Sequence, residues 1–155
     1  MCLPVHPFKV EREWEHAGLK CAVVQAREAS FRCAYVRVPP GHPLHGKYYD
    51  DDAVDVNVHG GLTFAQIEPC TEEDGMGWWF GFDFCHCNDA MHDPDPDMAT
   101  IREATKHMLA TVNRIHCEVS IEVYGRILVN REHFWTQAEV EHECEDLAEQ
   151  LAAMK

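Results

Sequence analysis

The sequence predicts an α+β fold, in which a mostly antiparallel sheet of about five strands packs against a C-terminal amphipathic helix and a second helix near residues 100–115. The first half of the chain carries β-branched or alternating apolar runs separated by Gly and Pro, whereas the last part places apolar residues at helical spacing. A length of 155 residues matches one domain of the usual size. We therefore expect residues 1–155 to form a single domain with its own core.

The first two expected strands form a hairpin. Residues 19–27 and 31–38 are rich in β-branched and apolar side chains, and a three-residue polar connection separates them. Pro39 and Pro40 end the second strand, because proline has no backbone N–H to donate to a sheet. The segment from there through Asp52 is expected to be a long ordered loop.

A second hairpin is expected around a pair of glycines. Valines alternate with polar residues over 54–58, which is typical of a half-buried strand. Gly60 and Gly61 suit a two-residue turn, and residues 62–67 would return antiparallel. This hairpin would turn its valines toward the core and His59 toward a semi-polar cleft.

A further strand is expected over residues 77–84. Side chains alternate across a strand, so Trp79, Gly81 and Asp83 should share one face. The small glycine between a tryptophan and an aspartate leaves space in which a ligand or another backbone can approach.

Two capping-box patterns mark the expected helices. Thr100 with Glu103 begins the helix near 100–115, and a short edge strand at 119–123 would follow. Thr136 with Glu139 begins the C-terminal helix. Its apolar stripe, which should pack on the sheet, consists of Val140, Cys144, Leu147 and Leu151.

The charge of the chain restricts its partners. A formal net charge of −14, from 27 acidic and 13 basic residues, argues against direct nucleic-acid binding, which needs clustered Lys and Arg. It also argues against an anionic membrane surface, and no apolar run approaches the ~20 residues that span a bilayer. A basic protein partner or a metal cation remains compatible. The start of the sequence lacks a secretory signal pattern, so we expect a cytoplasmic protein with reduced cysteines.

Three residues form the candidate for chemistry. His59 ends one expected strand, while Asp83 and His86 lie at the end of another, so their side chains could converge at one edge of the sheet. Two imidazoles and a carboxylate suit a divalent metal such as zinc, or alternatively an acid–base pair with an orienting carboxylate. The alternative is structural: His59 and Asp83 would bind each other or the backbone and fix the turns.

The loop after the first hairpin adds candidate ligand contacts. Imidazoles, a lysine and tyrosines gather at residues 42–49, and such groups can stack on a base and meet a phosphate. A solvated surface loop is the alternative. The complete set of candidate ligand-binding residues is His42, Lys47, Tyr49, His59, Thr63, Trp79, Asp83 and His86.

Three strings of residues carry a family resemblance. They are residues 33–43 with the following Gly46-Lys47 and Tyr49-Asp50, Val58-His59-Gly60-Gly61-Leu62-Thr63-Phe64, and Trp78-Trp79-Phe80-Gly81-Phe82-Asp83 with His86. Together they resemble small proteins of tailed phages and actinobacterial prophages that carry no assigned function. The resemblance covers residues 31–93 and, more weakly, 135–151. It implies a phage accessory protein in the host cytoplasm, and such products often counteract host defence.

Three functions are compatible with these observations. The first is binding of a small polar or nucleotide-like ligand at the sheet edge. The second is hydrolysis of a phosphodiester by His59, Asp83 and His86, acting with a metal or as acid and base. The third is an acidic inhibitor that binds a host protein or mimics nucleic acid.

The expected redox state gives the first testable prediction. Thiol titration of the purified protein under denaturing, non-reducing conditions should find all eight cysteines free. Several intact disulfides would contradict the cytoplasmic assignment.

Overall fold

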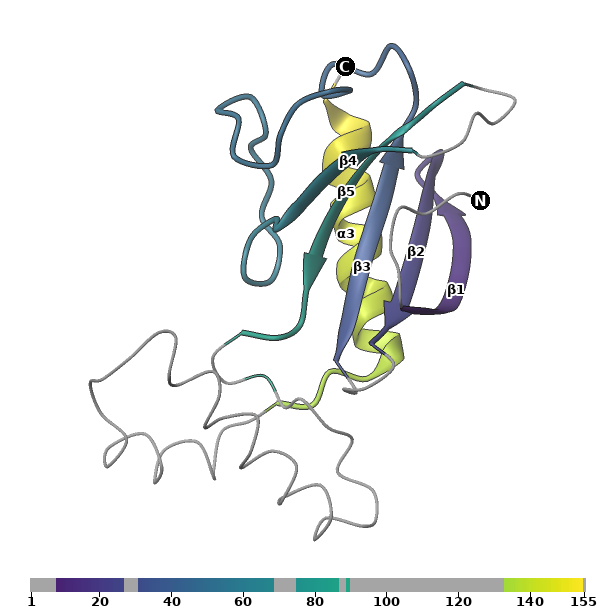
Figure 1. The fold of residues 1–155 in the computed structure, drawn as a ribbon, viewed down its shortest axis with the longest axis vertical. Helices are drawn as coiled ribbons and strands as arrows, with labels where there is room; N and C mark the ends of the chain where they lie inside the picture. Colours follow the sequence, from purple (N-terminus) through teal and green to yellow (C-terminus); the bar gives the residue numbers. More distant parts are fainter. Residues whose placement is uncertain (1–7, 27–30, 69–74, 87–88, 90–132, 155) are drawn as a thin grey trace, which may run out of the picture.

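One antiparallel sheet and one helix make up the regular structure of the described residues (Figure 1). The structure is a computed structural model that describes residues 8–26, 31–68, 75–86, 89 and 133–154. The sheet has five strands in the order β1-β2-β3-β5-β4, and α3 (Gln137–Ala153) crosses one of its faces. The α+β expectation is therefore confirmed, while the expected helix near 100–115 and the strand at 119–123 lie outside the described residues.

An edge strand that the sequence patterns did not predict precedes the first expected hairpin. β1 (Lys9–His16) pairs antiparallel with β2 (Leu19–Gln25), and the turn between them places Ala17 and Gly18 at φ 51° and 79°. β1 is rich in charge and mostly exposed, as suits an edge strand, so it lacks the apolar alternation that marks a half-buried strand.

The centre of the sheet has two buried faces. β2, β3 (Arg32–Val38) and β5 (Trp78–Asp83) are neighbours in it, and β4 (Phe64–Ile67) is the second edge. The face beneath α3 includes Cys21, Val23, Ala34, Val36, Val38, Trp78, Phe80 and Phe82. The opposite face carries a smaller apolar cluster of Ala22, Val24, Cys33, Tyr35 and Trp79. The parity of β5 therefore puts Asp83 on the face away from α3, because it alternates with the buried Phe82.

Residues 54–58 do not form the expected strand. Their valines pack against the core beneath α3, but the backbone of Asn57 bonds to a side chain: its N–H donates to Gln150 Oε1 at 2.7 Å, and its C=O accepts from Gln150 Nε2 at 2.9 Å. The turn is one residue earlier than expected: the N–H of Gly61 donates to the carbonyl of Val58 at 3.0 Å, so His59 and Gly60 are its central residues. Gly60 and Gly61 both have positive φ, 67° and 83°. The chain leaving that turn pairs with β5 rather than with residues 54–58. The expected second hairpin is therefore wrong.

α3 begins and packs as expected. Thr136 Oγ1 accepts from the N–H of Glu139 at 3.3 Å, and Glu139 Oε2 accepts from the N–H of Thr136 at 2.8 Å. The four stripe residues Val140, Cys144, Leu147 and Leu151 are fully buried. No described helix is both long enough and apolar enough to cross a membrane.

The buried stripe generates a stability prediction. Leu147→Ala should lower the free energy of unfolding by about 2–5 kcal/mol, because it removes a fully buried side chain and leaves a cavity. His142→Ala, on the exposed side of the same helix, should change it by less than about 0.5 kcal/mol. Urea unfolding measures both. Equal effects would mean that the stripe does not hold α3 on the sheet.

Candidate functional site

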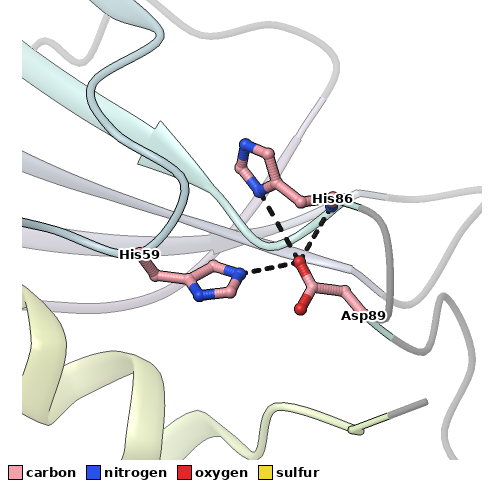
Figure 2. A group of neighbouring side chains, drawn as sticks. All are labelled: His59, His86 and Asp89. Atoms are coloured by element: carbon pink, nitrogen blue, oxygen red, sulfur yellow. Dashed lines mark hydrogen bonds and ion pairs between the residues drawn. The ribbon is translucent and has the colours of Figure 1, made fainter. Parts of the chain in front are cut away.

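The candidate site lies where the chain leaves β5 and where α3 begins (Figure 2). After Asp83 the chain buries Phe84 in the core beneath α3 and continues to His86 and Asp89. His86 and Asp89 close a turn: the N–H of His86 donates to Asp89 Oδ2 at 2.8 Å, and the N–H of Asp89 donates to the carbonyl of His86 at 3.0 Å. This turn directs the Asp89 carboxylate toward the glycine turn that carries His59.

Asp89 is the best-bound polar group of the site. Its side chain is 4% exposed, and Oδ2 accepts from His59 Nε2 at 2.8 Å. Oδ1 accepts from the indole Nε1 of Trp135 at 2.8 Å. Burial alone would raise the pKa of this carboxyl, but the hydrogen bonds from His59, from the N–H of His86 and from Trp135 outweigh it. The pKa of Asp89 therefore lies below its ordinary value.

The ring of His59 is held between aromatic side chains. It stacks on Phe84 with centroids 5.2 Å apart and planes 4° apart, and it lies 4.6 Å from the ring of Trp135. Because the ionised Asp89 can only accept, the proton of a neutral His59 is held on Nε2. The Nδ1 atom then carries a lone pair with no hydrogen-bond partner among the described residues, on the side of the ring that faces α3 in Figure 2.

His86 completes the group. Its ring lies over Gly60, where a Cβ atom would approach within 2.2 Å, so only glycine fits there. His86 Nδ1 lies 3.6 Å from Asp89 Oδ2 and 3.8 Å from Asp83 Oδ1. This nitrogen is buried and has no hydrogen-bond partner among the residues that the structure describes. One ligand atom from each of His59, His86 and Asp89 lies within 4.8 Å of the other two.

A hollow of about 490 Å³ adjoins His59 on the α3 side. It is lined by Asn57, Val58, His59, Trp135, Glu143, Asp146, Glu149 and Gln150. The carboxylates of this lining come from α3. The hollow is therefore negatively charged, apart from the imidazole and indole at one wall.

Asp83 does not bind His59, which corrects the expected pairing. It accepts instead from Thr63 Oγ1 at 2.9 Å and from the N–H of Cys85 at 3.2 Å. His59 stacks on Phe84 beneath α3, whereas Asp83 lies on the other face with Tyr35, in the lining of a separate hollow of about 360 Å³. The carboxylates of Asp83 and Asp89 both lie near the Nδ1 atom of His86.

The remaining candidate ligand contacts are dispersed. Trp79 is 0% exposed within the cluster away from α3, so it lines no open cleft. Lys47 pairs with Asp51 at 3.1 Å, and the neighbouring Tyr48 packs on Trp78 at the start of β5. A six-residue strand spans roughly 16 Å, so this loop and Tyr49 lie at the opposite end of β5 from Asp83.

His42 has a structural role. The N–H of Leu44 donates to its Nδ1 at 3.1 Å, so its proton lies on Nε2, which donates to the carbonyl of Leu151 at 2.9 Å. The carbonyl of Leu151 also accepts from the N–H of Met154 at 3.1 Å, so His42 adds a second donor at the end of α3, where the last turn has no basic residue.

Sequence patterns missed Asp89 and Trp135. The only signal for Asp89 is its spacing of three from His86, which suits a turn closed by a side chain. Trp135 directly precedes the capping threonine of α3, and that position fixes it beside the site.

The buried carboxylate generates a pH prediction. A pKa below the unfolded value of 3.8 means that Asp89 stabilises the fold fully above that value, and the contribution is lost as pH falls through the folded pKa. Asp89→Asn should lower the free energy of unfolding by about 1–3 kcal/mol at neutral pH. Between about pH 5 and pH 2 the free energy of unfolding should then fall less steeply with pH than it does in wild type. Urea unfolding in metal-free buffer measures this, with the exposed Asp146→Asn as control. Parallel pH curves for Asp89→Asn and wild type would contradict it.

Comparisons with protein-family models, with curated proteins and with solved structures found no significant match for this chain.

Proposed function

We propose that the protein binds a small polar ligand in the hollow beside His59. The observation that carries this proposal is the His59–Asp89 pair: a 2.8 Å hydrogen bond fixes the imidazole, and its Nδ1, on the side of α3, has no hydrogen-bond partner among the described residues. A fixed imidazole with a free lone pair accepts a hydrogen bond from a ligand, or takes a proton from it, without the cost of ordering the ring.

The charge of the lining selects the kind of ligand. Glu143, Asp146 and Glu149 border the same hollow, and their field favours a neutral or positively charged group over a phosphate. The ring of Trp135 adds a flat wall that attracts a cation. We therefore favour an amine, amide or hydroxyl compound over a nucleotide-like ligand.

Acid–base hydrolysis is the second candidate, and the same pair favours it. Asp89 orients His59 as a carboxylate orients a general base, and Nδ1 is the atom that would accept a proton from water or substrate. A phosphodiester fits the acidic hollow less well than a neutral substrate does. A role as a phage accessory protein in counter-defence is a further proposal, and the motif resemblance alone supports it.

Ligand-detected NMR tests the proposal with a library of primary amines, amino acids, amides, sugars and nucleoside monophosphates, in the presence of a chelator. We expect hits among the neutral and cationic compounds. Their affinity should fall at least about tenfold in His59→Ala, which removes the contact atom. Asp146→Asn should weaken the binding of the cationic hits and leave that of the neutral hits unchanged, because it removes one negative charge from the lining.

His142→Ala is the matched control, because it removes an exposed imidazole from α3 outside the hollow. It should bind every hit as wild type does. A library without hits, or hits that bind His59→Ala as tightly as wild type, would exclude this ligand site.

A further inference from the structure

We infer that His59, His86 and Asp89 form a binding site for one divalent transition-metal ion, with zinc as the best fit. The site uses Nε2 of His59, on the edge of the ring that meets Asp89, whereas the hollow lies beside Nδ1. The inference therefore shares a residue with the proposed ligand site but does not depend on any ligand in the hollow.

The distances between the ligand atoms suit a small tetrahedral ion. Zinc bonds of ~2.0–2.1 Å place two ligand atoms about 3.3 Å apart. Here His59 Nε2 lies 2.8 Å and His86 Nδ1 lies 3.6 Å from Asp89 Oδ2, on either side of that value. The two nitrogens lie within 4.8 Å of each other, so modest rotations of the rings bring all three atoms to one ion.

The state of each ligand atom also favours a metal. His86 Nδ1 is buried and has no hydrogen bond within the part of the chain that the structure describes, a costly condition for a polar atom that coordination would remove. The carboxylate of Asp89 is fixed in place, because Oδ2 accepts from His59 Nε2 and the second oxygen accepts from Trp135 Nε1. A hydrogen bond to the non-coordinating atom of a metal-binding side chain orients that side chain and tunes its basicity. Coordination through Nε2 of a neutral His59 moves its ring proton to Nδ1, so the imidazole remains a neutral ligand.

The donor set selects the class of metal. Two imidazoles and one carboxylate favour zinc and its first-row neighbours over magnesium and calcium, which prefer oxygen ligands throughout. Three protein ligands leave a fourth position for water, and both imidazoles are partly exposed, with 25% and 30% of their side chains accessible. Asp83, whose Oδ1 lies 3.8 Å from His86 Nδ1, is a second carboxylate beside the ion and not one of its three ligands.

Titration of the chelator-treated protein with Co²⁺ and Zn²⁺ tests the inference. The visible absorption of Co²⁺ reports the coordination number, and calorimetry gives stoichiometry and affinity. We expect one strongly bound ion in a tetrahedral environment and a rise in Tm. Asp89→Asn and His86→Gln should each weaken binding at least about a hundredfold.

The controls separate this site from the other histidines and cysteines of the chain. His142→Ala removes an exposed imidazole, and Cys85→Ser removes an exposed thiol near the site, so neither should change the affinity. His86→Gln keeps the inference testable if Asp89→Asn does not fold. No binding, or binding that survives both ligand substitutions, would overturn the metal site. The binding of small molecules in the hollow is measured separately, in the presence of a chelator. The metal site and the small-molecule site can therefore each be excluded without the other.

Discussion

The carboxylate of Asp89 joins three parts of the chain that share no strand or helix. It accepts hydrogen bonds from the glycine turn through His59, from the exit of β5 through the N–H of His86, and from the residue before the α3 cap through Trp135. Hydrogen bonds to a charged group contribute about 1.5–3 kcal/mol each, and a buried carboxylate without donors would oppose folding. The positions of His59 and Trp135 thus depend on one ionised side chain.

Glycines provide the close approaches on both faces of the sheet. A Cβ at Gly60 would overlap the ring of His86, and a Cβ at Gly81 would lie 2.4 Å from the ring of Tyr35. Each glycine lets an aromatic or imidazole ring lie directly on the backbone. The ring of His86 can therefore lie against the backbone of Gly60, close to Asp89.

Side-chain periodicity predicted what each residue faces better than what its backbone binds. The stripe of α3 and the parity of β5 follow directly from spacing, and both are observed. Val54, Val56 and Val58 alternate because one side of their segment lies on the core, but the backbone of Asn57 meets the amide of Gln150 instead of another strand. Alternation reports burial, and a strand also needs a backbone partner. The role of Asp89 depends on a turn and on Trp135, which is 46 positions away. No local pattern distinguishes it from the aspartates around it.

The pairing of β2 and β3 with α3 has a kinetic consequence. The thiol of Cys144 donates to the carbonyl of Tyr35, and His42 reaches Leu151; each contact joins residues 109 positions apart. Closing a loop of that length costs about 4 kcal/mol of chain entropy before any contact is gained. β1, β2 and β3 can pair early, because short connections join them in sequence, but their inner face stays open until this closure occurs. We therefore expect a slow final folding step, preceded by a species whose uncovered valines and phenylalanines favour association between chains.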